Sequence, residues 1–157
     1  MADLGFQKPL GRVCGQGEPI IVEKLIELTT SCVPGAAVKY GSTQGEVVAN
    51  DTSGNEIVGF LGWETCNPTD RPSTIDTAYA TNAVAPVIKI GRGVAIRAIL
   101  GKNMTITAGA ALTPGATSTS GAGSLIEGTP GTDNIVAYAL EDVTTTTAVA
   151  TIWVQTV

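Results

Sequence analysis

Residues 35–38, Gly35-Ala36-Ala37-Val38, and residues 57–64, Ile57-Val58-Gly59-Phe60-Leu61-Gly62-Trp63-Glu64, form a pattern that the chain contains twice. The second copy is Gly109-Ala110-Ala111-Leu112 followed by Ile135-Val136-Ala137-Tyr138-Ala139-Leu140-Glu141. The offsets are 109 − 35 = 74 and 135 − 57 = 78, so the second copy has four more residues, which fit in the Gly- and Ser-rich loop 114–124. Each copy is typical of a turn, a short strand, a loop and an apolar strand.

Two explanations of this repetition remain open. If it is a true duplication, the fold has pseudo-twofold internal symmetry and two pseudo-repeated halves. A chance match is the alternative, because Gly, Ala and Val often match one another in a β-rich sequence of low diversity.

Short runs of Val, Ile and Thr between Gly- and Pro-rich turns predict strands over most of the chain. Residues 20–28 carry apolar side chains at a period of two, which favours a strand and leaves a helix as the alternative. Residues 87–90 and 94–100, separated by Gly91-Arg92-Gly93, predict a hairpin. Residues 65–86 contain Pro68, Pro72 and Pro86 and predict a long connection.

The number of predicted strands indicates the fold class. Together with the segments above, we expect strands at residues 36–40, 45–49, 104–107, 110–113 and 148–155. About nine short strands with hardly any helix predict an all-β fold, either a small β-barrel or a tulip-like sandwich. We expect residues 20–157 to form a single β-barrel domain.

Residues 1–19 are expected to form an extended N-terminal arm, because their glycines and prolines disfavour a helix or a long strand. The arm has too few apolar residues to fold alone. One interpretation is that it becomes ordered against another chain, and a simple disordered terminus is the alternative. Its candidate contact residues are Leu4, Phe6, Leu10 and Val13.

The composition argues against an enzyme. The 157 residues include no histidine, which removes the commonest general base and metal ligand and excludes Ser-His-Asp and Cys-His catalysis. The carboxylates are best explained as solvated strand-end acids, and the three scattered cysteines do not make a zinc site. We therefore expect no catalytic, cofactor-binding or metal-binding residues and no small-molecule substrate.

The basic residues are unevenly distributed. The net charge is −5, yet no acid lies between Asp76 and Glu127, where Lys89, Arg92, Arg97 and Lys102 follow one another closely. These four are either solvated side chains on strand faces or a contact patch for an acidic partner. A nucleic-acid partner is disfavoured, because the overall balance is acidic and no aromatic residues interleave the basic ones.

The N-terminal sequence lacks the features of a signal peptide, and no apolar run is long enough for a membrane span. We therefore expect synthesis in the cytoplasm and no membrane partner. Cys14, Cys32 and Cys66 are too widely spaced to indicate a disulfide framework, and we expect them to be buried thiols.

Several segments together resemble the head decoration, or structural cement, proteins of tailed viruses. They are the Gly/Pro-rich start, residues 33–38, residues 57–64, Thr105-Ile106-Thr107-Ala108-Gly109-Ala110-Ala111-Leu112 and residues 135–141. In that family an I-T-A-G-x-x-L step is followed, after a variable loop, by a V-G-x-A-L-E-like strand. The resemblance covers roughly residues 33–64 and 87–157, and it departs from the family at Ala137, where glycine is common.

This resemblance implies a non-enzymatic virion protein that is made in the host cytoplasm. It would assemble as a homotrimer on the exterior of an icosahedral capsid and clamp neighbouring major capsid proteins. The alternative from another class is a tail or fibre β-module that binds a host surface carbohydrate. A cellular enzyme or ligand carrier on a β-barrel would require a cavity lined with convergent polar groups.

Overall fold

The computed structural model describes residues 14–16, 20–27, 32–91, 93–116 and 121–157. These residues form 13 strands and no helix, so the all-β prediction is confirmed. None of them belongs to a helix that is long and apolar enough to cross a membrane. The strands are β1 (Cys14–Gln16), β2 (Ile21–Ile26), β3 (Ala37–Tyr40), β4 (Glu46–Ala49), β5 (Gly59–Leu61), β6 (Val84–Lys89), β7 (Ala95–Leu100), β8 (Thr105–Ile106), β9 (Ala111–Pro114), β10 (Leu125–Glu127), β11 (Ala137–Ala139), β12 (Val143–Thr144) and β13 (Ala150–Thr156).

The first half of the chain closes into a barrel, called barrel 1. Its strand order is β2-β4-β3-β5-β6. β2 and β4 are parallel, and the other neighbouring strands are antiparallel. Alternate residues of each strand point inward, so the interior consists of branched aliphatic side chains. The fully buried ones include Ile26, Val38, Val47, Leu61 and Val87.

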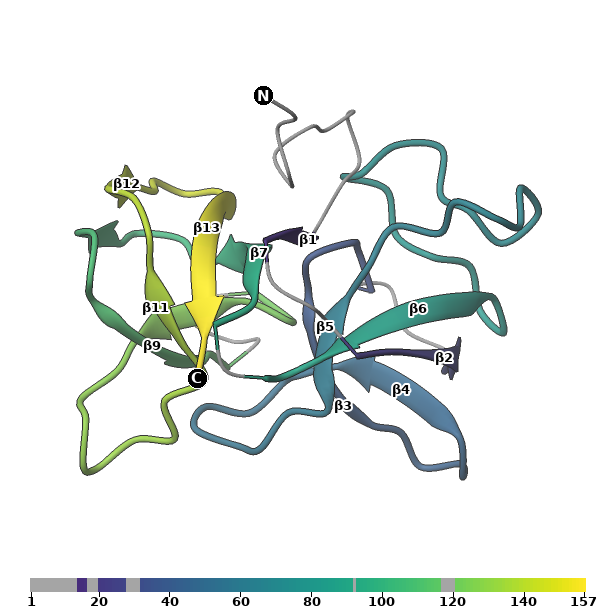
Figure 1. Cartoon of the computed structure of the whole chain (residues 1–157), viewed down its shortest axis with the longest axis horizontal. Coiled ribbons are helices and arrows are strands. Elements are labelled where there is room, and N and C mark those ends of the chain that lie inside the picture. Colours follow the sequence, from purple (N-terminus) through teal and green to yellow (C-terminus); the bar gives the residue numbers. More distant parts are fainter. Residues whose placement is uncertain (1–13, 17–19, 28–31, 92, 117–120) are drawn as a thin grey trace.

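The second half forms barrel 2, which has the same topology. The order is β7-β10-β9-β11-β13, and β13 pairs back to β7 to close the barrel. Again the first pair, β7 and β10, is parallel and the rest are antiparallel. Figure 1 shows the barrels side by side, with barrel 1 in purple to teal and barrel 2 in green to yellow. Fully buried residues of barrel 2 include Leu100, Leu112, Leu125, Ile152 and Val154.

The strand registers of the two barrels are equivalent. Ala37 pairs with Phe60 in barrel 1, and Ala111 pairs with Tyr138 in barrel 2. The offsets 111 − 37 = 74 and 138 − 60 = 78 are those of the sequence pattern. The repeated sequence pattern therefore marks equivalent positions in two barrels of one topology.

Two loops account for the changes in offset. Val47 of β4 is equivalent to Leu125 of β10, with 125 − 47 = 78, so the four extra residues lie in the loop between β9 and β10. Val87 of β6 is equivalent to Val154 of β13, with 154 − 87 = 67. The connection after β11 is therefore 78 − 67 = 11 residues shorter than the connection after β5.

The structure differs from the sequence-based expectations in two respects. Residues 20–157 contain two closed barrels rather than one, because each half has the five strands that closure needs. The hairpin expected around Gly91 is wrong, since β6 pairs with β2 and β5 whereas β7 pairs with β13, β10 and β1. The glycine-rich segment therefore connects the two barrels instead of turning one strand back on the next.

The barrels contact each other through different faces. Barrel 2 contributes a docking end, defined by Ile99, Pro114, Gly115, Ala122 and Gly123. Barrel 1 contributes a receiving face, defined by Gly35, Ala37, Asn50, Phe60 and Ile88.

Backbone hydrogen bonds and apolar packing join these two surfaces. The Ala37 N–H donates to the Gly123 carbonyl at 2.8 Å, and the Gly123 N–H donates to the Asn50 carbonyl at 2.8 Å. Phe60 and Ile88 of barrel 1 belong to the same buried cluster as the core of barrel 2. The chain is thus one packed unit of two barrels.

Gly35 is, together with Gly123, one of the points at which the two barrels approach most closely. Its φ of +88° favours glycine, and a Cβ added there would lie 2.8 Å from the Arg97 backbone oxygen. The Gly35 carbonyl accepts a hydrogen bond from the Ile99 N–H at 3.2 Å. The equivalent residue of barrel 2, Gly109, has a φ of +87° but no atom within 4 Å of an added Cβ.

Tyr79 attaches the long connection after β5 to barrel 1. Its buried hydroxyl donates to the Gly62 carbonyl at 2.8 Å and accepts from the Glu64 N–H at 2.7 Å. Burial, with the nearby Glu64 carboxylate, raises the pKa of Tyr79 well above its usual value despite the Glu64 N–H bond. The hydroxyl therefore remains protonated and holds both hydrogen bonds.

The matched glycines allow a direct test of the barrel contact. Gly109→Ala should lower the free energy of unfolding by about 1 kcal/mol, the usual effect of a side chain at positive φ. Gly35→Ala should lower it by about 1–3 kcal/mol more, because its Cβ also displaces the Arg97 backbone. Denaturant unfolding of both variants, followed by tryptophan fluorescence in dilute solution, measures the difference. Equal losses would contradict the tight contact at Gly35.

Candidate functional site

Three residues at one end of barrel 1 form the most distinctive surface of the chain, here called the cationic end: Lys24, Tyr40 and Lys89. On β2 the less exposed side carries Val22, Lys24 and Ile26, so Lys24 occupies a core-facing position. Lys89 follows Val87 on the core-facing side of β6, where it pairs with Gly59. A lysine at such a position extends its ammonium group out of the barrel mouth to reach water.

Both ammonium groups lie over the same aromatic ring. The Nζ atoms of Lys24 and Lys89 are each 5.7 Å from the centroid of the Tyr40 ring, which is the range of a cation–π contact. Tyr40 itself is largely exposed. The ion pair between described residues is Lys39 with Asp51, so neither Lys24 nor Lys89 has a carboxylate partner within the described part of the chain.

Barrel 2 shows that the fold does not need cations at these positions. The equivalents of Lys24, Tyr40 and Lys89 in barrel 2 are Ala98, Pro114 and Thr156, in that order, and all three are buried. The Thr156 hydroxyl donates to the Gly91 carbonyl within the chain. In barrel 2 these positions are buried, whereas in barrel 1 the two lysines are partly exposed, so their ammonium groups are available to a binding partner.

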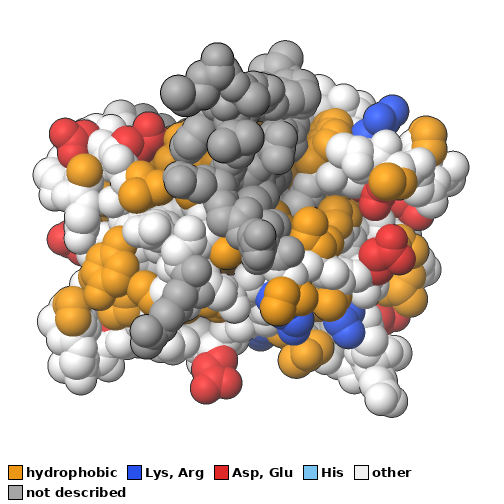
Figure 2. All heavy atoms as spheres, in the orientation of Figure 1, with side chains coloured by type: hydrophobic (Ala, Val, Ile, Leu, Met, Phe, Trp, Pro, Cys, Tyr) orange, Lys and Arg blue, Asp and Glu red, His pale blue; other side chains and the backbone are white. Residues whose placement is uncertain are grey.

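Exposed apolar side chains border the cationic end. Ile20 is strongly exposed, and its carbonyl accepts the Lys89 N–H at 2.8 Å. Ile21, which pairs with Ile88, is also exposed. Figure 2 shows basic side chains beside hydrophobic ones on the lower part of barrel 1. An exposed aromatic ring among exposed apolar side chains is typical of a protein contact surface.

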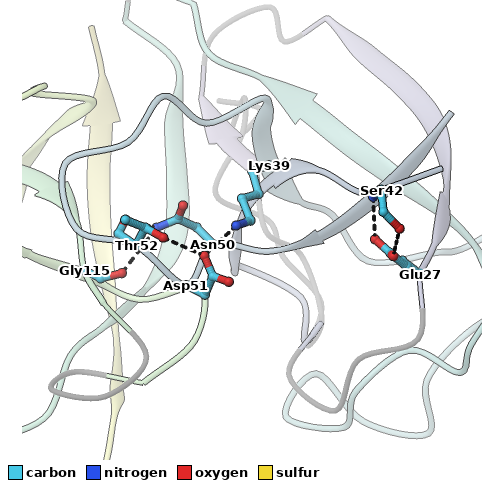
Figure 3. A network of polar contacts seen from close by, with 7 residues as sticks. All are labelled: Glu27, Lys39, Ser42, Asn50, Asp51, Thr52 and Gly115. Carbon is cyan, nitrogen blue, oxygen red and sulfur yellow. Dashed lines mark hydrogen bonds and ion pairs between the residues drawn. The ribbon is translucent and has the colours of Figure 1, made fainter. Parts of the chain in front are cut away.

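Two carboxylates of barrel 1 are already engaged by other groups (Figure 3). Glu27 accepts hydrogen bonds from the Ser42 hydroxyl and from the Ser42 N–H, the latter at 3.0 Å, and these bonds lower its pKa. Asp51 accepts from Lys39 Nζ at 2.5 Å, and this contact, with the Thr52 hydroxyl, lowers its pKa. The hydrogen bonds between Glu27 and Ser42 fix the turn between β3 and β4, which follows Tyr40.

Figure 3 also shows a link between the barrels. The Asn50 side chain donates to the Thr52 carbonyl at 2.7 Å and to the Gly115 carbonyl at 3.2 Å. Gly115 belongs to barrel 2, so this bond joins the docking end to the receiving face. The equivalent residue in barrel 2 is Gly128, which has no such side chain.

The basic residues singled out in the sequence do not form one patch among the described residues. Lys89 is part of the cationic end of barrel 1. Arg97 lies on β7 of barrel 2, where its Nη2 donates to Thr151 Oγ1 at 2.8 Å, and Lys102 follows the same strand. Five other candidates lie outside the described residues: Leu4, Phe6, Leu10, Val13 and Arg92.

Sequence reasoning missed Lys24 and Tyr40. The available signal was the polar residue Lys24 in the apolar phase of residues 20–28, between Val22 and Ile26. That Lys24, Tyr40 and Lys89 converge depends on closure of the barrel, which brings β2, β3 and β6 together.

The cysteines differ from the expectation of three buried thiols. Cys32 is buried, Cys66 is exposed, and the side chain of Cys14 lies outside the described residues. The exposure of Cys66 follows from its place in the polar connection after β5. Within the described ranges, no group of three His, Cys, Asp or Glu side chains could hold a metal ion.

Comparisons with known proteins give a distant structural likeness. No family model and no curated protein matches the sequence. The N base of the head fibre gp8.5 of bacteriophage phi29 is similar with a TM-score of 0.49 and 12% identity, over 89% of this chain and 98% of that chain. At that score and identity the likeness carries no argument about function.

We expect the two lysines to be dispensable for folding. Replacing them by the residues that barrel 2 has, Lys24→Ala with Lys89→Thr, should change the free energy of unfolding by less than about 1 kcal/mol, because exposed charges contribute little to stability. Denaturant titration of the double variant measures this. A loss above about 2 kcal/mol would show that the lysines are structural and would remove the argument for a binding role.

Proposed function

We propose that this chain is a non-catalytic structural protein of a tailed virus, which binds the exterior of the icosahedral capsid and clamps neighbouring major capsid proteins. The exposed apolar residues Ile20 and Ile21, which border the cationic end of barrel 1, are the observation that carries the proposal. They offer apolar contacts to a protein partner. The partner we propose is the major capsid protein, and the chain acts as a homotrimer.

The sequence segments that resemble decoration proteins support this proposal through their placement. Residues 105–112 span β8, the turn at Gly109 and the start of β9, and residues 135–141 contain β11. β9 and β11 are neighbours in barrel 2, so the two segments lie side by side. They form one structural unit rather than scattered matches.

The physical logic of such a protein is avidity. A capsid presents many identical subunits, and the joints between them are strained when the shell expands around its genome. A bound clamp that touches several subunits multiplies modest contacts through effective concentration. Surfaces with few charges and many exposed apolar residues suit that role. Among the described residues, the exposed large apolar ones are Ile20, Ile21, Leu25, Tyr40, Tyr138, Leu140, Val149 and Val157.

A carbohydrate-binding tail or fibre module is the second candidate. The observation that favours it is the exposed Tyr40 ring flanked by two cations, a platform on which an acidic sugar could stack. Binding to acidic oligosaccharides, with no binding to capsids, would support this candidate over the first.

The first experiment is reconstitution on capsids. Purified chain should co-sediment with expanded capsids that lack it, saturate at a fixed copy number, and appear as external density in cryo-electron microscopy. It should also raise the temperature at which the capsids open, because bound ligands stabilise the state that they bind. Absence of the chain from saturated, washed capsids would contradict the proposal.

The arm supplies a second prediction. Residues 14–16 form β1, which pairs with β7 of the same chain, so an arm contact with the capsid falls to residues 1–13, outside the described part. Deleting residues 1–13 should leave the thermal unfolding of the barrels unchanged and weaken capsid binding at least about tenfold. Deleting residues 1–18 also removes β1 and serves as the comparison. Full binding by both deletions would show that the arm makes no capsid contact.

A further inference from the structure

Each chain contains one unused docking end and one unused receiving face. Within the chain, the docking end of barrel 2 packs on the receiving face of barrel 1. Since the barrels share one topology and register, barrel 1 has an equivalent docking end and barrel 2 has an equivalent receiving face. Neither is covered by the other barrel.

The unused docking end of barrel 1 exposes an apolar residue that is buried in its counterpart. Leu25 of β2 is equivalent to Ile99 of β7. Ile99 packs against barrel 1 and is 6% exposed, whereas Leu25 is 40% exposed. Next to it, Tyr40 stands where barrel 2 has the buried Pro114.

The unused receiving face of barrel 2 shows the same contrast. Phe60 of β5 is fully buried at the barrel contact, and its equivalent in β11, Tyr138, is 40% exposed. Gly35 meets the Arg97 backbone, whereas Gly109 keeps the same positive φ with open space beside it. Gly109 of barrel 2 therefore has the backbone conformation that allows a close contact at Gly35, but no other backbone of the described residues lies against it.

The unused surfaces carry charged residues at positions that are neutral in the used ones. At the docking end, Lys24 and Lys89 replace Ala98 and Thr156. Flanking the receiving face of barrel 2, the exposed acids Glu127 and Asp133 stand where barrel 1 has Ala49 and Asn55. Glu27 and Glu46 lie at the same docking end, so its charge is mixed, and the shared contact geometry rather than net charge favours a second copy of this chain as the partner.

We propose that the docking end of barrel 1 binds the receiving face of barrel 2 in a second copy, and so repeats between chains the contact that joins the barrels within each chain. Because the two surfaces differ, the association is head-to-tail and closes into a ring when the rotation permits. The inference defines how the proposed self-association occurs, and it does not require a capsid, so the purified chain tests it separately from the capsid contact.

The test uses three variants with the same type of change at exposed apolar positions. Leu25→Asp impairs the docking end, Tyr138→Asp impairs the receiving face, and Val149→Asp, at a residue 48% exposed outside both surfaces, is the control. Wild type and the control should form a closed oligomer in sedimentation equilibrium and light scattering. Each of the other two variants should raise the Kd of association at least about tenfold, because a buried charge at an interface centre is unfavourable.

Mixing separates head-to-tail association from symmetric pairing. An equimolar mixture of the Leu25→Asp and Tyr138→Asp variants retains one intact docking end and one intact receiving face, so it should form a 1:1 dimer and nothing larger. Circular dichroism and thermal unfolding confirm that each variant is folded. The proposal is overturned by a monomeric wild type at millimolar concentration, by equal weakening in the Val149→Asp control, or by folded variants that do not form the dimer when mixed.

Discussion

The backbone approach at Gly35 is the constraint on which the arrangement of the chain depends. Only a residue without a Cβ admits the Arg97 carbonyl at this distance, and the positive φ aims the Gly35 carbonyl at the Ile99 N–H. Around this contact, Ala37 and Gly123 are also small, so the two backbones can exchange hydrogen bonds directly. Small residues, rather than large interlocking ones, therefore fix how the barrels sit together. The apolar side chains of Phe60 and Ile88 add packing against the core of barrel 2.

The duplicated barrel provides an internal comparison that a single-barrel protein would lack. Where the two barrels agree, as in the paired registers of β3 with β5 and β9 with β11, the residues serve the fold. Where they differ, another cause must be found. Asn50 against Gly128 is explained by the barrel contact, because only Asn50 reaches across to the Gly115 carbonyl. Lys24 and Lys89 have no such explanation inside the chain.

The sequence predicted the strands better than their pairing. Runs of Val, Ile and Thr between Gly- and Pro-rich turns located ten of the strands and missed β1, β10 and β12, of which β1 lies in the glycine-rich start. The Gly91 segment was interpreted as a hairpin turn because glycine signals a change of direction without saying which strands it separates. The parallel pairs, β2 with β4 and β7 with β10, join strands that are not consecutive and follow only from closure of each barrel. The cationic end was unpredictable for the same reason, since Lys24, Tyr40 and Lys89 converge only when the barrel closes.

The difference between a tethered and an untethered contact bears on the lysines and acids at the unused surfaces of the two barrels. The barrels of one chain are joined by a short linker, so their effective concentration is high and neutral groups such as Ala98 and Asn55 suffice at their contact. A contact between separate chains has no linker and must be found by diffusion. In the proposed association, Lys24 and Lys89 of one copy would face Glu127 and Asp133 of another, and such local pairs favour one orientation over the others. The same backbone geometry can then serve both contacts, with the charges added where the tether is missing.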